Sequence, residues 1–114
     1  MKKIALGTDH AGYKMKEVIK AHLSHSGYVV VDFGVVFGGS GNGEVMVANK
    51  VAGLRCGVCW NVESARLTKE HNNANMIAIG GRMVSEKEGV EIVKAWLNAE
   101  FSGGRHQERI EKIE

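Results

Sequence analysis

The sequence predicts a doubly wound α/β fold, in which helices cover both faces of a mostly parallel sheet. Short runs of branched apolar residues alternate along the chain with segments whose apolar residues recur every three or four positions. Glycine is frequent, with 15 residues, and proline is absent. Glycine-rich turns follow several of the apolar runs, as expected where strands end and helices begin.

The composition limits the classes of protein to consider. A chain of 114 residues is expected to form a single domain, residues 1–114, with one modest core. Hydrophobic residues make up 44% and charged residues 25%, which favours a globular chain over a disordered one. The net charge of +2, without a basic run, gives no support for a nucleic-acid partner. Neither a signal-peptide pattern nor a membrane-length apolar run is seen, so we expect a cytoplasmic protein without a membrane partner.

The first predicted strand, residues 3–7, is followed by two candidate site residues, Asp9 and His10. They would lie at the carboxyl end of the strand, where parallel sheets bind their ligands. Asp9 could equally cap the amphipathic helix predicted over residues 11–25, whereas His10 suits neither a core nor a capping position.

The next strand poses a problem of connection. Residues 28–34 read as one strand and run directly into a second apolar run, residues 35–37. Two parallel strands need a crossover of a dozen or more residues between them. Residues 28–37 are therefore either one strand in a four-stranded sheet, or two strands of five that are not parallel neighbours within one chain. Strand exchange with a second chain would also satisfy the geometry.

The most distinctive segment is residues 38–44, with the sequence GGSGNGE, placed before a short helix predicted over residues 45–51. Free backbone N–H groups and the helix dipole make such a turn an anion-binding site, and glycine lets a ligand approach the backbone. A carboxylate would repel an anion unless it had a chemical task, so Glu44 is a candidate general base. The alternative is a tight turn that requires glycine.

Cys56 and Cys59 form a C-x-x-C pattern, which can indicate a redox pair. They lie inside a predicted strand, residues 54–60, where positions three apart point to opposite faces. A redox pair needs a helix N-terminus to lower a thiol pKa. We therefore interpret both cysteines as small core residues.

The last third of the chain predicts two helices, a strand and a charged tail. Asn61 can cap a helix that ends near residue 71, and a strand over residues 76–79 leads to Arg82. Residues 85–88 have the capping-box form S-x-x-E. The predicted buried face of the helix that follows comprises Gly89, Ile92, Val93, Trp96 and Leu97.

The charged segment that starts at Arg105 is predicted to be helical, with a solvated tail as the alternative. Arg105 and Arg109 would then share a face, and two guanidinium groups suit a phosphate or a carboxylate.

Together these elements predict a Rossmann-like or flavodoxin-like three-layer sandwich of four or five strands. Its carboxyl edge would gather Asp9, His10, the loop 38–44, residues 60–61 and Arg82. Such a set suits a small phosphorylated ligand that undergoes proton transfer, with loop N–H groups stabilising an enediolate oxygen.

Five motifs in this order resemble the ribose-5-phosphate isomerase B family, which includes galactose-6-phosphate and allose-6-phosphate isomerases. They are residues 9–12, 39–44 with 48–51, 70–74, 80–82 and 103–106. The resemblance implies an aldose–ketose isomerase of the pentose phosphate pathway without metal or organic cofactor. It would convert ribose 5-phosphate to ribulose 5-phosphate through a cis-enediolate.

The resemblance also implies roles for individual residues. One branch of the family has a catalytic cysteine at the position of Gly38, and the other has a glutamate at the end of the loop; this chain is similar to the glutamate branch. Glu44 would be the base, Asp9 would hold sugar hydroxyls, and His71 would assist ring opening beside Asn72. The alternative for His71 is a histidine that merely stabilises a helix C-terminus. The enediolate oxygen would be held by Ser40, Gly39, Gly41, Asn42 and Gly43, and the phosphate by His10, Arg82, Arg105 and Arg109.

Family members form dimers with residues of both chains in each site. They also carry about thirty more residues between the second and third strands, enough for one crossover. This chain resembles an isomerase domain shortened near residues 34–35. Loss of a covering helix would expose sheet surface, so we expect a homodimer or a rearranged, strand-exchanged homo-oligomer. The alternative functions are a non-catalytic anion- or nucleotide-binding module and an inactive, truncated variant.

Overall fold

The structure, a computed structural model, describes residues 3–8, 17–19, 21 and 29–113. Its described strands form a four-stranded sheet in the order β1-β2-β4-β3, and every neighbouring pair is parallel. The strands are β1 (Lys3–Thr8), β2 (Val29–Gly38), β3 (Cys56–Cys59) and β4 (Met76–Gly80). The predicted parallel α/β fold is confirmed.

Strand β2 runs without interruption through Gly34. It pairs with β1 on one side and with β4 on the other, so that Val35 lies opposite both Leu6 and Ile77. The crossover that seemed to be missing is therefore not needed, because the two apolar runs are one strand. Of the alternatives for residues 28–37, the structure takes the single strand in a four-stranded sheet.

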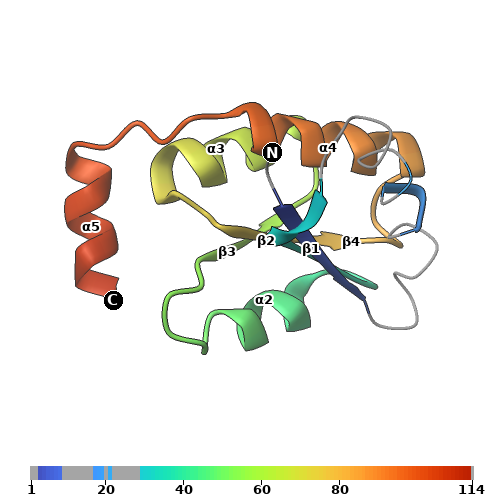
Figure 1. Ribbon diagram of the computed structural model, residues 1–114, viewed down its shortest axis with the longest axis horizontal. Coiled ribbons are helices and arrows are strands. Elements are labelled where there is room, and N and C mark those ends of the chain that lie inside the picture. The colour runs from blue at the N-terminus through green and yellow to red at the C-terminus, as the bar shows by residue number, and fades with distance from the viewer. Residues whose placement is uncertain (1–2, 9–16, 20, 22–28, 114) are drawn as a thin grey trace.

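Helices cover the two faces of the sheet unequally (Figure 1). Helix α2 (Asn42–Ala48) lies on one face, and α3 (Val62–Asn72) and α4 (Glu86–Asn98) lie together on the other. Helix α5 (Arg105–Ile113) stands beside the end of α3. Residues 17–19 and 21, the described part of the predicted helix 11–25, are also helical.

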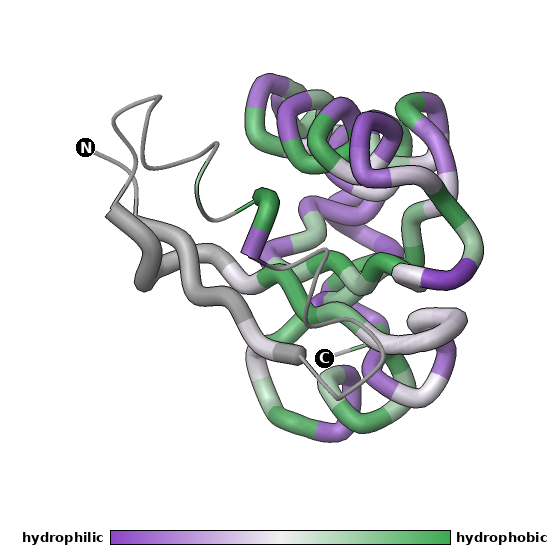
Figure 2. Tube along the Cα trace, turned by 90° about the vertical axis from the view of Figure 1, so that its right-hand side faces the viewer, coloured by the Kyte–Doolittle hydropathy of each residue, from purple (hydrophilic) through white to green (hydrophobic). Residues whose placement is uncertain are grey.

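Two apolar clusters fill the space between the layers. Along β4, Ile77 and Ile79 join the larger cluster with Trp96 of α4, whereas Ala78 between them joins the smaller cluster with Ala48 of α2. This alternation is the period of two expected of a strand buried on both faces. In Figure 2, hydrophobic stretches of the strands lie between helices that combine hydrophobic and hydrophilic residues.

The predicted buried face of α4 is confirmed residue by residue, since all five positions are buried. The indole of Trp96 is fully buried, and its Nε1 donates a 2.9 Å hydrogen bond to the carbonyl of Ala74. The predicted caps are also present. Asn61 accepts from the N–H of Ser64 at 2.7 Å, and Ser85 accepts from the N–H of Glu88 at 3.1 Å.

The two cysteines lie on opposite faces of the sheet, as predicted. Cys59 belongs to the larger cluster and Cys56 to the smaller one, and both are free and buried. Burial raises the pKa of the Cys56 thiol to about 11. Burial, with Cys56 nearby, raises that of Cys59 to about 12. These thiols are therefore protonated core groups at neutral pH.

Two boundaries differ from the prediction. Strand β3 covers only Cys56–Cys59. The N–H of Arg55 before it donates to Oδ1 of Asn75, at 2.8 Å, and the N–H of Trp60 after it donates to Oγ of Ser64, at 3.0 Å, so neither N–H pairs with a neighbouring strand. Helix α2 begins at Asn42, inside the glycine-rich segment, and ends at Ala48. Glu44 therefore lies in the first helical turn. None of the helices in the described residues is long and apolar enough to cross a membrane.

Candidate active site

The turn from β2 into α2 crosses directly over the end of β4. Gly41 has a left-handed backbone, with φ 87°, which favours glycine. A Cβ on Gly80 would lie 2.6 Å from the carbonyl carbon and oxygen of Ser40. Glycine at position 80 is thus what lets the turn pack against the carboxyl edge of the two central strands.

Hydrogen bonds hold this turn to the chain that follows β4. The N–H of Gly81 donates to the Gly38 carbonyl at 2.7 Å, and the N–H of Arg82 donates to the Gly39 carbonyl at 3.1 Å. The hydroxyl of Ser40 accepts from the N–H of Asn42 at 3.3 Å. The N–H groups of the first helical turn, which include Gly43 and Glu44, have no acceptor inside the helix. They and the helix dipole make this end of α2 attractive to an anion.

The carboxylate of Glu44 lies against Gly38, in the space that a side chain at position 38 would fill. Its side chain is partly buried, whereas Ser40, Asn42 and Gly43 are exposed. The carboxylate is thus held at the end of the central strand, next to a surface where a ligand can reach the backbone of the turn.

The guanidinium of Arg82 joins this group from the other side of the turn. A Cβ on Gly39 would lie 3.7 Å from both Cδ and Nη1 of Arg82, so the arginine side chain extends along the turn. Ser40, Glu44 and Arg82, with the backbone of the turn, form what we call the loop group. It combines a base, a hydroxyl, backbone donors and a cation.

A second set of predicted residues gathers where α3 meets α5, and we call it the helix-end group. His71 and Asn72 are the last residues of α3, and Arg105 and Arg109 lie on α5. The ring of His106 stacks on that of His71, with centroids 4.5 Å apart and planes inclined by 13°. The guanidinium of Arg109 contacts Nδ1 of His106.

The structure does not bring these two groups together within one chain. Helix α3 starts beside the carboxyl end of β3 and finishes shortly before the amino end of β4. Its eleven residues correspond to a length of about 16 Å. The helix-end group therefore lies at the edge of the sheet opposite the loop group. Within one chain, Arg105 and Arg109 therefore lie away from the loop group.

Two of the predicted residues, Asp9 and His10, lie outside the described residues. One residue of the helix-end group, His106, was missed by the sequence analysis. Its position three residues before Arg109 would place both on one face of a helix, which is the signal that could have found it. Partial desolvation lowers the pKa of His106, and electrostatic interactions with His71, Arg109 and Arg105 lower it further.

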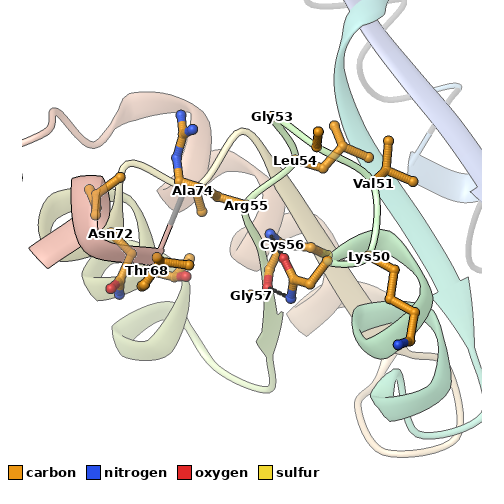
Figure 3. A pocket seen from close by; sticks show the side chains of 14 residues that line it. Lys50, Val51, Gly53, Leu54, Arg55, Cys56, Gly57, Thr68, Asn72 and Ala74 are labelled. Atoms are coloured by element: carbon orange, nitrogen blue, oxygen red, sulfur yellow. Dashed lines mark hydrogen bonds between the residues drawn. The ribbon is translucent and has the colours of Figure 1, made fainter.

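A large cavity, of about 700 Å³, lies elsewhere, between the chain that links α2 to β3 and helix α5 (Figure 3). It is lined by residues 49–57 and by residues of α3 and α5, including Asn72 and Ile113. Among the lining residues, the Asn49 side chain pairs with the backbone of Cys56 by hydrogen bonds of 2.9 and 2.8 Å. The cavity adjoins the helix-end group and does not contain the glycine turn.

The fold and the loop group define a class: parallel α/β proteins that present a glycine-rich turn and a carboxylate at the carboxyl edge of the sheet. The comparisons with known proteins identify the family. The model of the Ribose/Galactose Isomerase family matches residues 4–36 and 31–113, so this chain belongs to that family.

Individual relatives agree with this assignment. Ribose-5-phosphate isomerase B of Mycobacterium leprae is 41% identical over 96% of this chain and 86% of its own length. The protein of the same name from Escherichia coli K12 is 38% identical over 99% of this chain and 95% of its own length. Among solved structures, that of the Mycoplasma genitalium ribose-5-phosphate isomerase B with bound ribulose-5-phosphate is similar to this chain, with a TM-score of 0.95 and 31% sequence identity. The superposition covers 97% of this chain and 93% of the Mycoplasma chain. The family resemblance seen in the sequence is confirmed.

Proposed function

We propose that this chain is an aldose–ketose isomerase that interconverts ribose 5-phosphate and ribulose 5-phosphate. Membership of the Ribose/Galactose Isomerase family supports the reaction class, and the printed names of the relatives support the pentose phosphate as substrate. The observation that carries the chemistry is the Glu44 carboxylate held against Gly38, in the first turn of a helix that follows a glycine-rich turn.

In the proposed mechanism, Glu44 is the base that moves one proton between two carbons. Its carboxylate removes the proton from C2 of the open-chain aldose, and the electron pair of that C–H bond shifts so that O1 becomes negative, which gives a cis-enediolate. A proton then moves from O2 to O1, and the same carboxyl returns its proton to C1, which completes the ketose. Negative charge on the enediolate oxygen would be stabilised by Ser40 and by the N–H groups of residues 39–43.

The other predicted residues would bind and prepare the sugar. The substrate is a cyclic hemiacetal in solution, and opening the ring moves a proton from the anomeric hydroxyl to the ring oxygen. His71, beside Asn72, would assist this transfer, because an imidazole exchanges protons near neutral pH, and Asp9 would hold sugar hydroxyls. The phosphate would be bound by His10, Arg82, Arg105 and Arg109.

This mechanism needs both the loop group and the helix-end group at one substrate, and they lie at opposite edges of the sheet. We therefore propose a homodimer in which the loop group of one protomer faces the helix-end group of the other. Exposed apolar side chains that line the large cavity support such an interface. Val51 is 54% exposed and Ile113 80% exposed, and both line that cavity.

We propose further that residues 1–114 are one isomerase domain shortened near residues 34–35. Two findings support this. The family model matches in two stretches that overlap over residues 31–36, inside β2. The alignment with the Mycobacterium leprae relative spans 139 positions, more than the 114 residues of the chain. A strand-exchanged oligomer is the alternative to the homodimer, since β1 is an edge strand of the described sheet.

The direct test is the isomerisation of ribose 5-phosphate by the purified chain, with Glu44→Gln beside it. We expect turnover by the unmodified chain and a loss of about 10³-fold in kcat for the variant, the scale of a general base. Turnover unaffected by the substitution would remove Glu44 from the mechanism. If the folded chain binds phosphate but turns over no sugar phosphate, it is a binding module instead of an isomerase.

A further inference from the structure

The segment between α4 and α5 is built to bring His106 against the end of α3. The N–H of Ser102 donates to the carbonyl of Glu70 at 2.9 Å, which fastens the segment to α3 one residue before His71. Gly103 and Gly104 then both adopt left-handed backbones, with φ 69° and 59°, a conformation that favours glycine. The chain turns there into α5, and His106 is its second residue.

His106 makes two contacts at this place, one with its ring face and one with a ring nitrogen. The face covers the imidazole of His71 in a nearly parallel stack. Nδ1 receives the guanidinium of Arg109, and because a guanidinium can only donate, this nitrogen must be an acceptor. His106 is therefore neutral in this arrangement, which suits a stack beside cationic neighbours.

We propose that His106 is a positioning residue that holds His71 and Arg109 in the orientations the active site uses. The proposal rests on the proposed function, in which His71 assists ring opening and Arg109 binds the phosphate. His71 and Arg109 then do not act separately, because the imidazole of His106 supports both the ring of His71 and the guanidinium of Arg109.

Support from His106 matters because the side chains of His71 and Arg109 are both exposed. His71 lies on the last turn of α3 and Arg109 on the surface of α5. Side chains at such exposed positions lose rotamer entropy when they bind a ligand. A contact that orders them beforehand lowers the entropy lost at the moment of binding or reaction.

Two substitutions separate the two contacts. His106→Phe keeps an aromatic ring for the stack and removes the acceptor, so we expect KM to rise about fivefold with kcat nearly kept. His106→Asn keeps an acceptor at the place of Nδ1 and removes the ring, so we expect kcat to fall about fivefold with KM nearly kept. His106→Ala should show both effects.

Gln107→Ala is the matched control. Gln107 neighbours His106 on α5, and its side chain donates to Glu111 one turn along the same helix at 3.2 Å. This variant removes a side-chain hydrogen bond on the surface of α5 and leaves the contacts of His106 with His71 and Arg109 in place. We expect it to keep the kcat and KM of the unmodified chain.

A second readout does not depend on turnover. Stacked rings shift each other's NMR signals, so the ring-proton resonances of His71 should move in His106→Asn and His106→Ala but stay nearly unchanged in His106→Phe and Gln107→Ala. Binding of inorganic phosphate should weaken in His106→Phe and in His106→Ala and persist in His106→Asn.

These measurements distinguish failure of this proposal from failure of the proposed function. If the unmodified chain has no isomerase activity, the NMR shifts and phosphate affinities still decide whether His106 orders its neighbours. If the chain is an active isomerase and all three His106 variants match Gln107→Ala in kcat, KM, His71 resonances and phosphate affinity, His106 has no positioning role.

Discussion

The carboxylate of Glu44 occupies the place of a side chain on Gly38. Gly38 is the last residue of β2, and Glu44 lies in the first turn of α2, so the glycine turn folds the carboxylate back onto the strand that precedes it. A side chain at position 38 and a carboxylate in this location exclude each other. This exclusion is expected from the family resemblance, which implies a base at one of these two positions or the other.

A methyl group added at position 38 should therefore displace the Glu44 carboxylate. We expect Gly38→Ala to lower kcat by about 100-fold, the cost of moving a catalytic group by about 1 Å, while the chain stays folded by circular dichroism. Gly7→Ala is the control, because its Cβ would meet Val36 at 3.4 Å, an ordinary contact. Equal kcat values for the two variants would contradict the proposed position of Glu44.

A methyl group at position 80 should damage the turn itself. The Cβ would meet the backbone of Ser40 at 2.6 Å, and backbone cannot rotate away as a side chain can. We expect Gly80→Ala to lower the free energy of unfolding by about 1–3 kcal/mol, the range for overpacking, and to weaken phosphate binding. Urea unfolding measures the first effect. An unchanged midpoint would mean that the turn can move away from β4.

The two buried thiols predict a loss of stability at high pH. Their pKa values in the folded chain are about 11 and about 12, above the ordinary value of 9.0. Between pH 9 and these values the unfolded chain ionises and the folded chain does not, so the free energy of unfolding falls as the pH rises. The slope should be at most about 1.4 kcal/mol per pH unit for each thiol. Urea unfolding from pH 8 to 10.5 measures it, and the double variant Cys56→Ala, Cys59→Ala should lack this component.

The proposed two-chain site predicts complementation between inactive variants. Glu44→Gln damages the loop group and His71→Ala the helix-end group, so a mixed dimer contains one site with neither change. Refolding the two variants together should restore about a quarter of the normal activity, since half of the dimers are mixed and each has one intact site of two. Refolding each variant separately is the control. No recovery in the mixture, from protein shown to be dimeric, would place the whole site within one chain.

Local features of this protein follow directly from its sequence. The capping pairs at Asn61 and Ser85, the buried face of α4 and the opposite faces of Cys56 and Cys59 are all set by spacing within a few residues. Helical and strand periods decide such features wherever they occur in a chain. The family, too, is recognisable from motifs that are each only a few residues long.

Other features depend on contacts between distant segments. Whether residues 28–37 form one strand is decided by pairing with both β1 and β4. The start of β3 is decided by Asn75, twenty residues beyond Arg55. The division of the candidate site into two groups follows from the length and direction of α3, which carries His71 away from the turn that holds Glu44. The family and the candidate site residues can be read from the sequence, because its motifs are local. Which of these residues meet depends on where each helix ends in space, so it follows from the folded chain alone.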